Sequence, residues 1–246
     1  MINIIQGDSC VTLVIDRPER RNALTNAMYA ELDLALQAAQ ADAGCKAVIL
    51  TGSGGHFTAG NDLSEFQTAR SAGDSPALAF LRRLAGIDVP VIAAVEGRAV
   101  GVGVTLLQHC DFVYAGHDAV FSLPFVSLGL CPEGGSSLLM AQIAGARRAA
   151  EWLLLGRPFS AREAQDSGLI TAATASGQAL EHARRIAAEL ASQPGQALRD
   201  SKRILRNAGR AALDRAFDDE RDLFTQRLRS EEAQAAFRRF FESKKK

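Results

Sequence analysis

The 246-residue sequence predicts an α/β fold. Up to about residue 140, short β-rich runs alternate with glycine turns and helical patterns, and this order is typical of an α/β core. From about residue 141 the pattern is helical almost throughout. Hydrophobic residues make up 47% of the chain, so a core of this size needs no disulfide or metal for stability.

The N-terminal part contains several runs with strand character. Cys10–Ile15 is rich in β-branched residues and ends at the turn Asp16-Arg17-Pro18, so it is predicted to be a strand. Short apolar runs predict further strands over residues 47–51, 89–95, 111–115 and 119–121.

Helices are predicted from apolar spacing and from capping residues. Asn26 is expected to cap a helix over Ala27–Ala41, whose apolar residues fall on one face. Ser160 and Glu163 form a capping-box pattern at the start of the helix predicted over Ala161–Asp166. Other helices are predicted over residues 104–108, 145–155, 177–192, 195–208, 211–229 and 231–242.

Charge and hydropathy exclude several classes of protein. The 28 basic and 28 acidic residues balance, which argues against a nucleic-acid-binding protein. No apolar run reaches the roughly 18 residues that cross a bilayer, and the first residues do not resemble a signal peptide. The scattered cysteines (Cys10, Cys45, Cys110 and Cys131) are interpreted as reduced thiols. We therefore expect a cytoplasmic protein with no membrane association.

The common cofactor and nucleophile motifs are absent. The sequence has no Gly-x-Ser-x-Gly elbow and no Walker loop, and Gly101-Val102-Gly103 lacks the third glycine of a dinucleotide fingerprint. The four histidines show no metal-ligand spacing. The sequence thus predicts no metal site and no bound cofactor.

Two glycine-bearing loops are candidates for chemistry, over residues 56–63 and 96–105. Glycine lets the backbone approach a ligand closely, and two backbone N–H groups aimed at one oxygen form an oxyanion hole. The alternative is that these glycines only serve tight turns, and the spacing alone leaves both interpretations open.

A third candidate segment runs over residues 121–137 and is mostly apolar. Glu133 is the only acidic residue in it and follows Pro132. A carboxylate in apolar surroundings suits a general base. The alternative is a glutamate at the start of a helix that interacts with the helix dipole. The residues themselves do not separate these two roles.

Taken together, these segments resemble the crotonase (enoyl-CoA hydratase/isomerase) superfamily, from about Val11 to Phe241. Each motif alone is modestly specific, whereas all of them in this order are highly specific. The segments that carry the resemblance are Arg17-Pro18, Asn22-Ala23-Leu24 and residues 57–63, 91–104, 121–136, 156–164 and 168–170.

The resemblance implies a fold and an assembly. The expected fold is a crotonase-like (ClpP/crotonase) spiral of ββα units over residues 1–190, followed by a C-terminal helical trimerisation region over residues 191–246. A homotrimer or a hexamer (a dimer of trimers) is implied. The expected partner is an acyl-CoA substrate, whose coenzyme A is part of the substrate and not a cofactor.

The resemblance also assigns site residues. The oxyanion N–H groups would be those of Asn61 and Val102, the latter in the loop that begins at Gly101. The coenzyme A portion would lie along the backbone of Ala59, Gly60, Asn61, Asp62 and Leu63. Asp62 is expected to brace this loop.

Two departures from the hydratase pattern bear on the activity. Hydratases of this superfamily place glutamates at the positions of Thr105 and Phe125, so both carboxylates are missing here. The segments resemble instead the peroxisomal-type Δ3,Δ2-enoyl-CoA isomerases, in which the glutamate at the position of Glu133 is the base. Thr105 and Phe125 are then expected only to pack, with Phe125 shielding the acyl chain. Hydration, thioester hydrolysis and non-catalytic acyl-CoA binding remain alternatives.

Two further expectations concern the ends of the substrate. The phosphates of coenzyme A are expected to meet Arg17, Arg20 or Arg21, or the basic C-terminal stretch, and the spacing does not choose among them. The segment Ser64–Pro76 is expected to be mobile and to line the acyl entrance.

Overall fold

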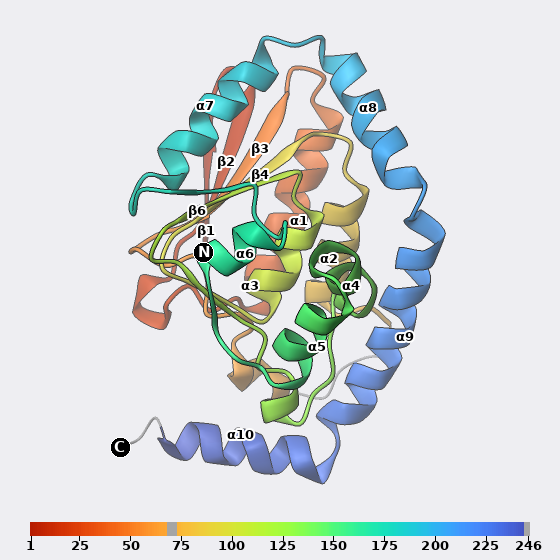
Figure 1. Ribbon diagram of the computed structural model, residues 1–246. Helices are drawn as coiled ribbons and strands as arrows, with labels where there is room; N and C mark the ends of the chain where they lie inside the picture. Colours follow the sequence, from red (N-terminus) through yellow and green to blue (C-terminus); the bar gives the residue numbers. More distant parts are fainter. Residues whose placement is uncertain (68–72, 244–246) are drawn as a thin grey trace.

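The computed structural model describes residues 1–67 and 73–243 and confirms the α/β fold, with a large sheet, a small sheet and surrounding helices (Figure 1). Among these residues, the large sheet has six strands in the order β1-β2-β3-β4-β6-β9 and the small sheet has three in the order β5-β7-β8. The large-sheet strands are β1 (Ile2–Gln6), β2 (Cys10–Ile15), β3 (Ala47–Gly52), β4 (Val91–Val95), β6 (Phe112–Gly116) and β9 (Ala172–Thr174). The small-sheet strands are β5 (Arg98–Val100), β7 (Val120–Ser122) and β8 (Phe159–Ser160).

The chain spirals through the two sheets in repeated ββα units. β4 of the large sheet is followed by β5 of the small sheet and then by helix α3 (Val102–Thr105). β6 is followed in the same way by β7 and later by helix α4 (Ser136–Ala144). After β3, Thr58 makes a single parallel bridge to Ala99 before helix α2 (Pro76–Gly86) begins. The predicted spiral of ββα units is therefore confirmed.

Helices cover both faces of the large sheet, because parallel strands are buried on both sides. Side chains alternate along β3: Val48 and Leu50 join the core beneath α1 (Asn26–Ala41) and α2. Ile49 faces the opposite way and packs with the alanines of α7 (Ala179–Ala191). This explains why β3 is a continuous apolar run in the sequence.

The C-terminal part is helical, as expected. It comprises α8 (Gly195–Asn207), α9 (Arg210–Leu228) and α10 (Glu231–Ser243), which run along one side of the core and beneath it (Figure 1). Phe217 and Phe224 of α9 and Phe237 of α10 are buried in the same core cluster as the strands. The division into residues 1–190 and 191–246 stays a prediction.

Some element boundaries differ from the predictions. Thr25, not Asn26, caps α1, because Thr25 is extended and its hydroxyl accepts the Met28 N–H at 3.3 Å. The helix predicted over 104–108 begins earlier, at Val102, directly after Gly101. Gly145, at φ 76°, separates α4 from α5 (Ala146–Leu154). The sequence analysis did not predict β1, β5, β8, β9, α2 or α4.

The predicted capping box is confirmed. Ser160 and Glu163 form a reciprocal capping box at the start of α6 (Ala161–Asp166). The four cysteines are free thiols. No helix within the described residues is long and apolar enough to cross a membrane. The described residues also form four short 3-10 helices: η1 (Pro18–Arg20), η2 (Leu63–Gln67), η3 (Leu106–His109) and η4 (Val126–Leu128).

Asn22 connects three loops by hydrogen bonds at the end of the large sheet. It is fully buried and adopts a left-handed backbone conformation, with φ 60°. Its side chain accepts the Arg17 N–H at 2.9 Å and donates to the carbonyls of Ser53 and His56 at 2.8 and 2.7 Å. Its own carbonyl accepts the Thr58 hydroxyl at 2.6 Å. These contacts fix the chain just before the Ala59–Leu63 loop.

We expect Asn22→Ala to lower the free energy of unfolding by about 2–4 kcal/mol, since it removes the hydrogen bonds to the Arg17 N–H and to the Ser53 and His56 carbonyls. Urea unfolding measures the change. Asn3→Ala is the matched control, because the Asn3 amide is exposed and makes a single 3.3 Å hydrogen bond to Asp16. A loss no larger than that of the control would contradict this account of Asn22.

Candidate active site

The two glycine-bearing loops lie in direct backbone contact. The Val100 N–H donates to the Thr58 carbonyl at 3.1 Å, and the Thr58 N–H donates to the Arg98 carbonyl at 3.0 Å. A Cβ on Gly60 would lie 2.6 Å from the Val100 carbonyl oxygen, so only glycine allows this approach. The two segments that the sequence singled out therefore form one unit.

Each loop presents a backbone N–H that has no acceptor within the described residues. Val102 is fully buried and is the first residue of α3, so its N–H lies outside the hydrogen bonds of the helix. Asn61 follows Gly60, and its N–H is likewise unbonded there. Unpaired donors on adjoining loops are what an oxyanion hole requires.

The loop that carries Asn61 is braced by polar contacts. The Tyr29 hydroxyl donates to Asn61 Oδ1 at 2.6 Å, and Arg17 Nη1 lies 2.7 Å from Asp62 Oδ2. Burial opposes ionisation of Asp62, but hydrogen bonds from Ser64 and Arg17 outweigh it and lower the Asp62 pKa. Asp62 thus braces its loop as expected, and it does so through its ion pair with Arg17.

Glu133 meets Thr105, a residue on the same short helix as Val102. The Thr105 hydroxyl donates to Glu133 Oε1 at 2.7 Å, and Thr105 is fully buried. The expectation that Thr105 only packs is therefore wrong. The sole signal in the sequence was that Thr105 occupies a hydratase glutamate position. Phe125 is buried, next to the start of η4.

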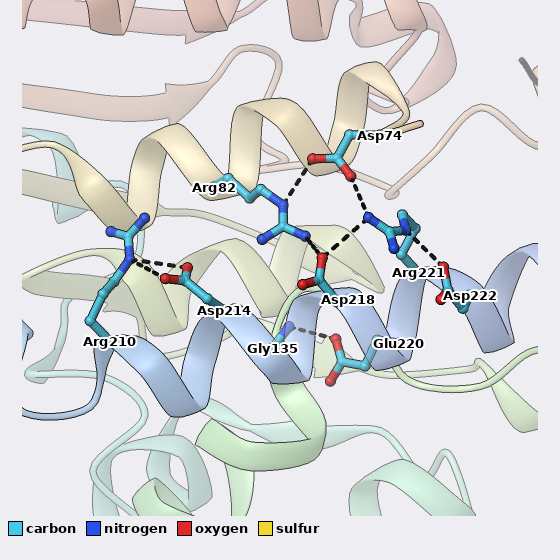
Figure 2. A network of polar contacts seen from close by, with 9 residues as sticks. All are labelled: Asp74, Arg82, Gly135, Arg210, Asp214, Asp218, Glu220, Arg221 and Asp222. Atoms are coloured by element: carbon cyan, nitrogen blue, oxygen red, sulfur yellow. Dashed lines mark hydrogen bonds and ion pairs between the residues drawn. The ribbon is translucent and has the colours of Figure 1, made fainter. Parts of the chain in front are cut away.

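The turn after Glu133 is fixed from two sides. His109 Nε2 lies 2.8 Å from the Gly134 carbonyl oxygen. The N–H groups of Gly135 and Ser137 donate to Glu220 of α9 at 2.6 and 2.7 Å, and Figure 2 shows the first of these bonds. Burial raises the Glu220 pKa although these hydrogen bonds lower it. The buried Glu220 thus caps the start of α4.

A cavity of about 290 Å³ brings Asn61 and Glu133 together. The other predicted site residues, Val102 and Phe125 among them, do not line it within the described part of the chain. Its apolar walls come from α2 and α9, two helices whose part in the site the sequence analysis missed. Besides Glu133, the cavity-lining residues with apolar or charged side chains are Pro76, Ala77, Leu78, Phe217, Phe224, Glu65, Asp74, Glu220 and Arg221.

The expected acyl entrance, Ser64–Pro76, is described in part. Glu65 and the residues from Gly73 to Pro76 line the cavity. Residues 68–72 lie outside the described part of the chain, so the expectation about them stays a prediction.

A family model described as "Enoyl-CoA hydratase/isomerase" matches residues 6–246. The chain belongs to this family. It is 36% identical over 217 residues to the 2,3-dehydroadipyl-CoA hydratase of Escherichia coli, covering 87% of this chain and 84% of that protein. It is 33% identical over 251 residues to human enoyl-CoA delta isomerase 2, covering 99% of this chain and 64% of that protein.

A solved structure of the family has the same architecture. The structure of Pseudomonas aeruginosa OdaA superposes with a TM-score of 0.94 at 42% identity, covering 97% of this chain and 98% of that chain. The predicted membership of the crotonase superfamily is thus confirmed. The chain is an enzyme of the enoyl-CoA hydratase/isomerase family.

In this family member, ion pairs join α2 and α9 beside the cavity (Figure 2). Arg82 lies 2.8 Å from Asp74 and 2.6 Å from Asp218, and Arg221 lies 3.5 Å from Asp74 and 3.2 Å from Asp218. An exposed ion pair contributes only about 0–1 kcal/mol, but a network of several charges contributes more. These contacts hold together the two helices that form the apolar walls.

His109 donates from Nε2, because a carbonyl oxygen can only accept a hydrogen bond. Its Nδ1 is buried and has no partner within the described residues. Burial, together with the nearby charges of Arg206, Arg210 and Lys202, lowers the His109 pKa to about 4, although the hydrogen bond to Gly134 raises it.

We therefore expect His109 to make stability depend on pH between 6.5 and about 4. Below pH 6.5 the unfolded chain binds a proton at this histidine that the folded chain does not bind, so stability falls as the pH falls. The contribution is on the order of 3 kcal/mol. Urea unfolding at pH 7 and pH 4.5 measures it, and His109→Gln should lose less stability between the two pH values than the wild type. Equal losses would contradict the assignment.

Proposed function

We propose that this enzyme isomerises 3-enoyl-CoA to 2-trans-enoyl-CoA, with Glu133 as the single base. The observation that carries the proposal is the convergence of Glu133 and Asn61 on one cavity, while threonine and phenylalanine occupy the two hydratase glutamate positions. The similarity to human enoyl-CoA delta isomerase 2 supports the same reaction.

The proposed reaction is a 1,3-proton shift. The thioester oxygen accepts hydrogen bonds from the N–H groups of Asn61 and Val102. Glu133 removes a proton from C2, the electron pair of that C–H bond moves into a dienolate, and negative charge collects on the thioester oxygen. Glu133 then returns the proton to C4: the C3–C4 double-bond pair forms the new C4–H bond, the enolate pair moves between C2 and C3, and the thioester carbonyl reforms. Removal of one donor from comparable oxyanion holes costs about 2.7–4 kcal/mol.

The substrate is proposed to lie along the braced loop. The backbone of Ala59–Leu63 borders the coenzyme A portion, and Gly101 lets the thioester approach Val102. Phe125 shields the acyl chain from water, which favours proton return over addition of water. Coenzyme A enters and leaves as part of the substrate, so no cofactor is required. We propose a homotrimer or a dimer of trimers as the assembly.

Hydration is the second candidate, because the chain is also similar to a hydratase. Addition of water to a 2-enoyl thioester needs an acid–base pair around the double bond. Here the corresponding positions offer the hydroxyl of Thr105 and the ring of Phe125. The same assay distinguishes the two reactions, since isomerisation creates the conjugated thioester and hydration consumes it.

We expect Glu133→Gln to lower kcat on 3-hexenoyl-CoA by about 10³-fold, because the amide cannot accept the C2 proton. Formation of the conjugated thioester is followed by its ultraviolet absorbance. Glu31→Gln is the control, since the Glu31 carboxylate on α1 accepts the Ile2 N–H at 2.6 Å. Turnover that survives in Glu133→Gln would move the base to another residue. No turnover by the wild type, together with hydration of 2-hexenoyl-CoA, would favour the second candidate.

A further inference from the structure

Thr105 places a buried hydroxyl on the carboxylate of Glu133. The contact from Thr105 Oγ1 to Glu133 Oε1 is 2.7 Å, whereas the Val102 carbonyl oxygen lies 3.4 Å from the same hydroxyl. A hydroxyl has one hydrogen to donate, so the shorter contact to the charged oxygen takes it.

The backbone of Glu133 is held by other groups. Its carbonyl accepts the Ser136 hydroxyl at 2.5 Å, and the following residues bond to His109 and Glu220. These contacts fix where the side chain begins. The hydrogen bond from Thr105 acts at the far end of the side chain, on the carboxylate itself.

Thr105 also links the base to the proposed oxyanion hole. It is the last residue of α3, and Val102 is the first. One turn of helix therefore carries both an unpaired N–H donor and the hydroxyl that meets Glu133. The distance between the base and that donor is set within a single buried segment.

We propose that Thr105 is a positioning residue, whose hydroxyl orients the Glu133 carboxylate for proton transfer; this inference rests on the proposed function. Thr105 keeps its own hydrogen throughout. It donates to Oε1, which favours the arriving proton on Oε2. The C2–H bond breaks as the O–H bond forms on Glu133, and that O–H bond breaks as the C4–H bond forms.

The test compares Thr105→Val, which deletes the hydroxyl at nearly constant volume, with Thr105→Ser, which keeps it. With 3-hexenoyl-CoA, Thr105→Val should lower kcat about 10-fold or more and change KM less than about 2-fold. The acid side of its pH–rate profile should move to higher pH by about one unit, because the carboxylate loses a donor. Thr105→Ser should restore most of kcat and the wild-type profile.

Thr51→Val is the matched control for loss of a buried threonine hydroxyl. Thr51 on β3 is 4% exposed, and its hydroxyl donates to the Ala94 carbonyl at 2.9 Å. It should lose stability without a change in the pH–rate profile. If Thr105→Val does not fold, Thr105→Ala and Thr105→Ser form a second pair that differs by the hydroxyl alone.

Exchange of the C2 hydrogens in D2O separates the inference from the proposed function. Wild-type isomerisation with no loss of kcat and no profile shift in Thr105→Val would overturn the inference alone. Exchange without isomerisation would overturn the proposed function. In that case the exchange rate of Thr105→Val tests the inference: a rate 10-fold below the wild type supports it, and an unchanged rate overturns it. A wild type that does neither overturns both.

Discussion

The candidate site depends on the close approach of two backbone segments, Thr58–Gly60 and Arg98–Val100. Strand-like hydrogen bonds join them, and no side chain fits where Gly60 meets the Val100 carbonyl. Two N–H groups without an acceptor among the described residues come soon after these segments, at Asn61 after the first and Val102 after the second. Their spacing is set by backbone hydrogen bonds, which reorganise far less than side chains do. Fixed donors of this kind stabilise developing charge at little reorganisation cost.

The carboxylate is connected to this frame through buried polar contacts. Thr105 on α3 donates to the Glu133 carboxylate. His109 on η3 donates to the Gly134 carbonyl, and Glu220 on α9 accepts the Gly135 N–H at the start of α4. These hydrogen bonds fix the turn around Glu133 against three different helices. The C-terminal helices therefore do more than enclose the core, because α9 supplies both the cap and part of the cavity wall.

The sequence predicted best where local pattern and tertiary environment agree. β3 is apolar on both faces, and the predicted run over residues 47–51 matches the strand within one residue. β1 was not predicted because four of its five residues are exposed, and only pairing with β2 makes it a strand. The site segments around Asn61 and Glu133 could be found from the sequence. The contributions of Phe217, Glu220 and Phe224 could not, because they come from α9, a helix far along the chain.

Thr105 shows why a hydrogen bond such as that to Glu133 cannot be predicted from the sequence. Within an apolar run, a threonine carries no sign of what its hydroxyl will meet. In the structure that hydroxyl lies against a carboxylate, and a buried hydroxyl without an acceptor would be costly. A glutamate at position 105 would instead bring a second carboxylate against Glu133, and like charges at that distance resist ionisation together. The hydroxyl of Thr105 brings no such charge to Glu133 and donates a hydrogen bond to it instead.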